Sequence, residues 1–144
     1  TGWGVEANTE ELTGEGAANG HKEALIDGNL NTFWHSQWDG EGKNPPLPHI
    51  IIFDMQQTQN ILSIELARRQ NNLDLKAVMF SISDDKENWT ELGKLDFPND
   101  KVPNAQIILL PKAISGRYFR TTVTDSNNGV NASIAEIMFT MGKK

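Results

Sequence analysis

The 144 residues predict one all-β domain, a sandwich or jelly roll of seven or eight short strands. Apolar and polar residues alternate with a period of two in several segments, as in half-buried strands. Turns rich in Gly, Pro and Asn separate these segments, and no stretch has the apolar repeat of an amphipathic helix. The length suits a single domain, because domains most often contain roughly 100–150 residues.

The expected strands follow one another along the chain. A short first strand is expected at residues 3–5, and the Gly-, Glu- and Asn-rich residues 8–22 are interpreted as a surface loop. Residues 50–55 form a continuous apolar run, which is typical of a strand buried on both faces. The remaining strands are expected at residues 61–69, 78–82, 89–95, 106–110, 117–123 and 133–141.

Composition excludes several classes of protein. The net charge of -6 argues against binding to nucleic acid or to an anionic membrane surface, which need clustered Lys and Arg. No apolar run approaches the roughly 20 residues that span a bilayer, so no membrane insertion is expected. Cysteine is absent, which excludes disulfides and thiolate metal sites. The chain starts at Thr1 without a signal peptide, and we expect it to be a domain of a longer protein.

Residues 24–38 read Ala-Leu-Ile-Asp-Gly-Asn-Leu-Asn-Thr-Phe-Trp-His-Ser-Gln-Trp and place an oxygen-rich loop beside three aromatic residues. The loop starts like an EF-hand, but Thr32 and Trp38 stand where that motif needs Gly and Glu. Another oxygen cage for Ca²⁺ is possible, because backbone carbonyls also bind this ion. Glu136 interrupts an apolar strand and is the expected distant ligand, since buried Glu is rare unless paired. Alternatively, Asp27-Gly28-Asn29 is a plain turn and Glu136 faces solvent.

Six motifs occur in order along the chain. They are residues 24–38, His-Ile-Ile-Ile-Phe-Asp at 49–54, Ile-Glu-Leu-Ala-Arg-Arg-Gln at 64–70, Phe-Ser-Ile-Ser-Asp-Asp-Lys-Glu-Asn-Trp at 80–89, Gly-Arg-Tyr-Phe-Arg at 116–120 and Ser-Ile-Ala-Glu-Ile at 133–137. Together they resemble the coagulation factor V/VIII type C (discoidin) domains and, within them, the bacterial carbohydrate-binding modules of family 32. The resemblance is strongest to the N-terminal sugar-binding domain of galactose oxidase. It implies a galactose-binding-domain-like jelly-roll β-sandwich of about eight antiparallel strands.

The resemblance also implies a structural Ca²⁺ ion without a catalytic role. In the family, backbone carbonyls, a Thr and two carboxylates bind the ion, which joins an early loop to the last strand. The matching positions here are Ala24, Asp27, Asn29, Thr32, Ala135 and Glu136.

A galactose-type sugar site is implied in the same way, built from loops at one end of the sandwich. His35, Trp38 and Arg69 match its histidine, stacking aromatic and arginine, with Asn71 or Asn72 beside them. An Arg fork and an imidazole can hydrogen-bond neighbouring ring hydroxyls, and an aromatic ring can cover the apolar face of a sugar. The residues alone leave open that His35 only hydrogen-bonds its own loop.

The sequence departs from the family pattern in two places. Residues 125–131 contain no aromatic residue, although many of these modules have one in this loop. The disulfide of the animal domains is also missing, which favours the bacterial branch. Trp34 and Trp89 are expected in the core. Arg68 and Arg69 cannot face the same way on a strand, and the resemblance selects Arg69.

The predicted function is a non-catalytic carbohydrate-binding module that tethers a larger extracellular or cell-surface protein to galactose-type glycans. The alternative is a discoidin-type module that binds a protein or, against the acidic charge, a phospholipid. An enzyme is not expected, because the chain lacks a Gly-x-Ser-x-Gly elbow, a phosphate-binding glycine loop and a His-Glu-x-x-His motif.

Overall fold

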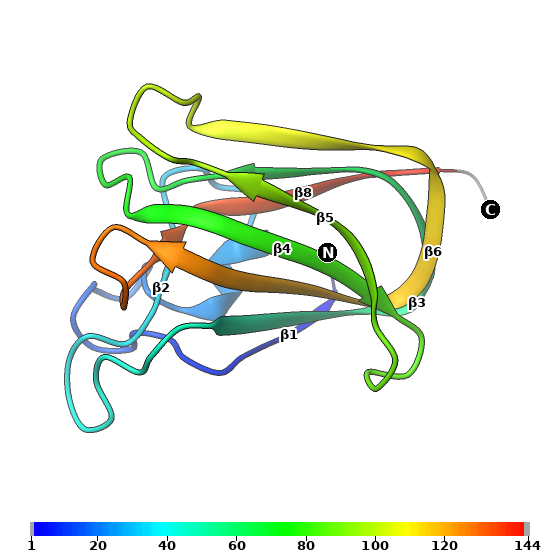
Figure 1. Cartoon of the computed structure of the whole chain (residues 1–144). Helices are drawn as coiled ribbons and strands as arrows, with labels where there is room; N and C mark the ends of the chain where they lie inside the picture. Colours follow the sequence, from blue (N-terminus) through cyan, green and yellow to red (C-terminus); the bar gives the residue numbers. More distant parts are fainter. Residues whose placement is uncertain (1, 143–144) are drawn as a thin grey trace.

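The computed structural model describes residues 2–142, which form antiparallel strands in two packed layers (Figure 1). The two longest strands, β3 (His49–Ala67) and β6 (Ala105–Ser126), pair with each other and curve from one layer into the other. Their pairing shifts register between Asp54 and Gln59 and again between Ile61 and Ser63. Such irregularities let a strand bend without ending its hydrogen-bonded ladder.

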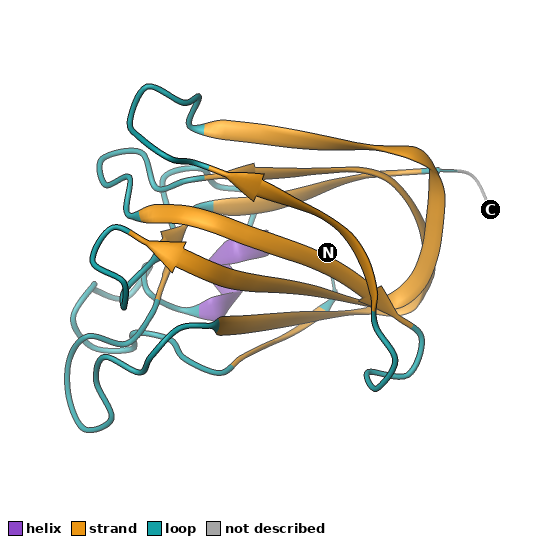
Figure 2. Cartoon of the chain, viewed as in Figure 1, coloured by secondary structure: helices purple, strands orange, loops and turns teal. Residues whose placement is uncertain are grey.

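The other strands complete the two layers. In the first, the order is β1-β3-β6-β4-β5, with β1 at Gly4–Ala7, β4 at Leu75–Ser83 and β5 at Thr90–Asp96. In the second, β8 (Glu136–Met141) pairs with the later half of β3. A separate two-stranded ribbon joins β2 (Trp34–His35) to β7 (Ser133–Ile134). A short 3-10 helix, η1 (Lys22–Ile26), packs against β8 (Figure 2).

The predicted all-β fold is confirmed, with differences in how the chain is divided. The predicted strands at 50–55 and 61–69 belong to one strand, β3, which ends at Ala67, and those at 106–110 and 117–123 both belong to β6. The apolar run at 50–55 is not buried on both faces. Ile51 and Phe53 are fully buried, whereas Ile50 and Ile52 are half-buried on the opposite face.

Aromatic residues fill the space between the layers. Trp34 is fully buried, as expected, and its Nε1 donates a hydrogen bond to the Thr9 carbonyl at 2.9 Å. Phe119 packs edge-on against Phe139, with ring centroids 4.7 Å apart. The expectation of a core position for Trp89 is wrong. It lies half-buried in the turn before β5, where the Arg120 guanidinium covers its ring at 4.2 Å.

The loops that carry the predicted sugar-binding residues all project from one end of the sandwich. Residues 36–48, 68–74 and 127–132 lie together on the left in Figure 1, beside the loop that follows β1. The turn between β4 and β5 lies at the opposite end. Within residues 2–142, none of the helices has the length and apolar character needed to cross a membrane.

Gly20 offers a test of how tightly the loop after β1 is packed. Its φ is 88°, and an added Cβ would lie 2.1 Å from the Glu11 carbonyl oxygen. At Gly16 the φ is similar, 84°, but the space around it is open. We expect Gly16→Ala to cost about 1–2 kcal/mol from backbone strain alone, and Gly20→Ala to cost roughly 1–3 kcal/mol more from the overlap. Urea unfolding of both variants measures this difference, and equal losses would contradict the close packing.

Candidate functional site

The buried carboxylate of Glu11 fastens the loop after β1 to the segment after β2. Its Oε2 accepts hydrogen bonds from the backbone N–H groups of Thr13 at 3.0 Å and Gly14 at 2.8 Å. Its Oε1 accepts from the N–H groups of Trp38 and Asp39, each at 2.9 Å. Burial by itself raises the pKa of Glu11, but these backbone donors outweigh burial and lower the pKa to about 2. Glu11 therefore stays ionised and holds both loops in place.

Trp38 is held against the same loop. A Cβ added to Gly14 would lie 2.4 Å from Cζ2 of the indole, so only glycine allows this approach. The indole Nε1 donates a hydrogen bond to Glu15 Oε1 at 2.9 Å. The residue nevertheless stays 38% exposed. One side of the ring is fixed by protein, and the remainder is open to a ligand.

Arg69 extends over a buried ring beside Trp38. Its guanidinium carbon lies 3.9 Å from the centroid of Phe33, and Nη2 lies 3.9 Å from Glu15 Oε2. Glu15 thus contacts both Trp38 and Arg69. The neighbouring Arg68 points into the interior, is 1% exposed and donates to the Val102 carbonyl at 2.9 Å. Only Arg69 of this pair is accessible to a ligand.

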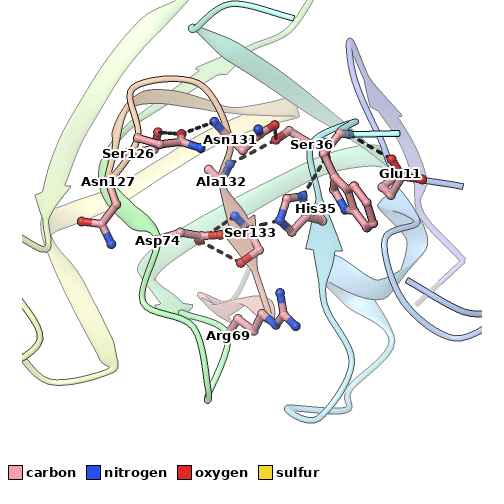
Figure 3. Close-up of polar contacts among 12 residues, drawn as sticks. Glu11, His35, Ser36, Arg69, Asp74, Ser126, Asn127, Asn131, Ala132 and Ser133 are labelled. Carbon is pink, nitrogen blue, oxygen red and sulfur yellow. Dashed lines mark hydrogen bonds and ion pairs between the residues drawn. The ribbon is translucent and has the colours of Figure 1, made fainter. Parts of the chain in front are cut away.

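His35 and Asp74 form a second polar pair (Figure 3). Asp74 Oδ1 accepts hydrogen bonds from the N–H and hydroxyl of Ser133 at 2.9 and 2.8 Å, and Oδ2 lies 3.7 Å from His35 Nε2. The Nδ1 atom of His35 lies 2.6 Å from the Ser36 carbonyl, which can only accept, so Nδ1 bears a proton. In the neutral imidazole, Nε2 is then an acceptor. Burial raises the pKa of Asp74, against the opposing effect of the Ser133 hydroxyl.

These side chains surround one cleft with a volume of about 400 Å³. His35, Trp38, Arg69 and Asn72, all predicted from sequence, line it, whereas Asn71 lines a separate hollow. Sequence reasoning missed the other members. They are Glu15, Asp74, Asn127, Asn128 and Asn131.

The missed asparagines belong to the loop that lacks an aromatic residue. Asn128 Oδ1 accepts hydrogen bonds from the backbone N–H groups of Val130 at 2.9 Å and Asn131 at 2.7 Å, which shapes the loop. Asn131 is held in turn by Ser36, whose hydroxyl donates to its Oδ1 at 2.9 Å. The run of polar residues at 125–131 indicates a polar loop in the sequence, but it does not show which of its side chains face the cleft.

The predicted metal ligands Asp27 and Glu136 meet where η1 packs against β8. The Thr32 hydroxyl donates a hydrogen bond to Asp27 and lies 3.1 Å from the Asn29 carbonyl. The Gly28 N–H donates to Glu136 Oε1 at 3.1 Å. Glu136 is only 3% exposed, so the alternative in which it faces solvent is wrong. Burial first, and then the adjacent Asp27 carboxyl group, raise the pKa of Glu136 to about 8.

This donor set suits a hard cation. Two carboxyl groups share a confined position, which is unfavourable when both are ionised unless a positive charge lies between them. Within residues 2–142 no three His, Cys, Asp or Glu side chains are grouped to hold a metal, so hydroxyl and carbonyl oxygens would complete such a site. Ala24, three residues before Asp27, and Ala135, directly before Glu136, are buried, at 4% and 1% exposure.

A comparison with protein families decides the relationship of the chain. The model of the F5/8 type C domain matches residues 5–137. The chain belongs to the F5/8 type C domain family. The resemblance expected from the six sequence motifs is thereby confirmed.

Solved structures agree with this assignment. The C-terminal domain of a chitobiase from Bacteroides fragilis is 37% identical to this F5/8 type C domain, with a TM-score of 0.80 over 99% of this chain and 97% of that one. The family 32 carbohydrate-binding module of Clostridium perfringens NanJ, solved in complex with galactose, has a TM-score of 0.75 at 19% identity, over 95% and 92% of the two chains. At that identity the second match shows a common fold.

Curated relatives contain the domain as a small part. A sialidase of Micromonospora viridifaciens is 27% identical over 137 residues, which cover 92% of this chain and 20% of the sialidase. Galactose oxidase of Gibberella zeae is 34% identical over 71 residues, or 49% of this chain and 10% of the oxidase. The chain therefore spans a fifth or less of the length of these two proteins.

The role of Glu11 in this F5/8 type C domain can be tested by its pH dependence. The ordinary pKa of 4.5 applies to the unfolded chain and about 2 to the folded one, so ionised Glu11 stabilises the fold above pH 4.5 and this contribution disappears as the pH falls toward 2. Glu11→Gln should lower the free energy of unfolding by roughly 2–3 kcal/mol at neutral pH, because its amide NH₂ faces N–H donors. The wild type should then lose stability more steeply than the variant as acid is added.

Chemical denaturation at a series of pH values measures both effects. Glu41→Gln, an exposed carboxylate on the loop after Trp38, is the control and should follow the wild type. Parallel pH profiles for the wild type and Glu11→Gln would contradict the proposed role.

Proposed function

We propose that this F5/8 type C domain is a non-catalytic carbohydrate-binding module for galactose-type glycans. It would tether a larger extracellular or cell-surface protein, of bacterial origin, to those glycans. The observation that carries the proposal is the convergence of Trp38, Arg69 and His35 around one cleft, from two segments far apart in the sequence. The common fold with the galactose-bound module of Clostridium perfringens NanJ supports it.

Each part of the cleft has a role in sugar recognition. The open part of the Trp38 ring covers the apolar C–H face of a pyranose. The Arg69 guanidinium, which is positioned by the Phe33 ring and the Glu15 carboxylate, donates hydrogen bonds to hydroxyl oxygens of the sugar. His35 Nε2 accepts a hydrogen bond from a neighbouring sugar hydroxyl. Because these groups are held by other residues before the ligand arrives, little conformational entropy is lost on binding.

The two carboxylates that line the cleft, Glu15 and Asp74, contact neighbouring protein groups, which supports a role in binding rather than in catalysis. Glu15 accepts a hydrogen bond from Trp38 and balances the charge of Arg69. One oxygen of Asp74 accepts two hydrogen bonds from Ser133. Both carboxylates thus position their neighbours, and a general acid or base would instead need to reach the substrate freely.

Substitution of the binding side chains tests the function. Trp38→Ala and Arg69→Ala should each weaken binding of galactose-terminated glycans by at least about tenfold, because each substitution removes a side chain that contacts the sugar directly. A glycan array followed by calorimetry measures the loss.

Matched controls lie at the other end of the sandwich. Trp89→Ala removes a half-buried indole, and Arg120→Ala removes a guanidinium that stacks on an aromatic ring, as Arg69 does. Both controls should bind glycans like the wild type. Wild-type affinity in both Trp38→Ala and Arg69→Ala, or absence of any glycan binding by the wild-type domain, would refute the proposal.

We also propose that a structural Ca²⁺ ion binds between the loop after η1 and the start of β8. Asp27 and Glu136 would supply its carboxylates, the Thr32 hydroxyl and Asn29 carbonyl lie beside them, and the carbonyls of Ala24 and Ala135 would complete the set. The ion would neutralise two adjacent carboxylates and so fasten an early loop to the last strand. It would play no part in catalysis.

Chelation tests the metal site. Excess EDTA should lower the melting temperature of the calcium-loaded domain by about 5–10 °C if calcium had been present at roughly a hundredfold above its Kd. Asp27→Asn should abolish most of this sensitivity, whereas Asp54→Asn, which alters a carboxylate paired with Arg117, should keep it. A melting temperature unchanged by EDTA, with no metal found by elemental analysis, would exclude the ion.

A further inference from the structure

A second hollow lies next to the cleft and has no role in the sugar contacts proposed above. It has a volume of about 220 Å³ and is bounded by the loop before β2 and the loop after β3. The lining residues are Leu30, Asn31, Thr32, Phe33, Arg69, Gln70 and Asn71.

Arg69 is common to the two depressions. Its guanidinium stacks on Phe33, which lines the second hollow, and faces Glu15, which lines the first. On the C-terminal side of Arg69, Asn72 lines the cleft and Asn71 lines the second hollow. Two successive asparagines of one loop thus line two adjoining depressions. A ligand longer than one sugar can therefore contact both depressions.

The chemistry of the second hollow resembles that of a sugar subsite. Leu30 is 47% exposed and offers an apolar surface for a C–H face. Asn31 and Asn71 are exposed, and their amides can both donate to and accept from hydroxyl or acetamido groups. Arg69 supplies the single formal charge of the lining, and the Glu15 carboxylate 3.9 Å away offsets that charge. Because little net positive charge is left to attract a carboxylate, the lining suits a neutral sugar rather than a uronate or sialic acid.

The walls of this hollow are held together before a ligand binds. Gln70 Nε2 donates a hydrogen bond to the Leu30 carbonyl at 3.4 Å, which connects the two loops. The Thr32 hydroxyl lies 3.1 Å from the Asn29 carbonyl and so closes the loop on its other side. A hollow that exists in the unbound protein needs little ordering on binding.

We propose that this hollow is a second subsite, which binds the neutral sugar residue linked to the one in the cleft. The domain would then recognise a galactose-containing oligosaccharide rather than a single terminal residue. The inference rests on the proposed function, because the first sugar must occupy the cleft beside Trp38 for its neighbour to reach Leu30 and Asn71.

The test compares Asn71→Ala with Asn72→Ala, two identical substitutions at adjacent positions. Calorimetry would measure the affinity for methyl β-galactoside and for a panel of neutral galactose-containing di- and trisaccharides, including lactose and GalNAc-β1,3-galactose. The wild type should bind at least one oligosaccharide about three- to tenfold more tightly than the monosaccharide. Asn71→Ala and Leu30→Ala should remove this gain and leave monosaccharide affinity unchanged. Asn72→Ala should weaken both ligands by the same factor.

The outcomes separate the two proposals. If the wild type binds the monosaccharide and no oligosaccharide more tightly, the second subsite is refuted while the function stands. The subsite is also refuted if Asn71→Ala and Leu30→Ala keep the oligosaccharide gain, or if they weaken the monosaccharide equally. If the wild type binds none of these galactosides, the proposed function fails and the subsite fails with it.

Discussion

The buried carboxylate of Glu11 is the interaction on which the arrangement of the binding end depends. A sandwich rigidly orients its strands, but its loops need contacts of their own to adopt one conformation. Glu11 supplies them by accepting backbone hydrogen bonds from residues on both sides, at 13–14 and at 38–39. The low pKa of Glu11 has the same cause. The backbone N–H donors that stabilise the ionised carboxylate belong to these loops, so the same hydrogen bonds stabilise the loops.

The cleft follows from that constraint through a short chain of contacts. With the first loop fixed, Gly14 and Glu15 position the indole of Trp38, and Glu15 also faces Arg69. On the far side, Ser133 holds Asp74, and Asp74 faces His35. Side chains from distant parts of the sequence are therefore placed by polar contacts with each other, which leaves their outer atoms free for a ligand.

The loop between η1 and β2 connects the two proposed ligand sites. Its first half carries Asp27 and Asn29, which interact with Glu136 beside the proposed cation position. Its second half carries Leu30 and Phe33, which form walls of the second hollow. A cation that orders the first half would also steady the second, because Thr32 contacts Asp27 and lines that hollow. The metal and the outer sugar residue would then be linked through one short loop.

Local sequence patterns determined the fold class, because period-two alternation and turn residues report directly on strands. The ordered motifs determined the family, and they also indicated four of the residues that line the cleft. Only the tertiary structure separated Asn71 from Asn72 and brought Glu15, Asp74 and three asparagines into the same cleft. It also joined the predicted strands into two long bent ones and moved Trp89 out of the core. The physical reason is that the direction of a loop side chain is set by partners far away in the chain, such as Ser133 for Asp74, and no local pattern records them.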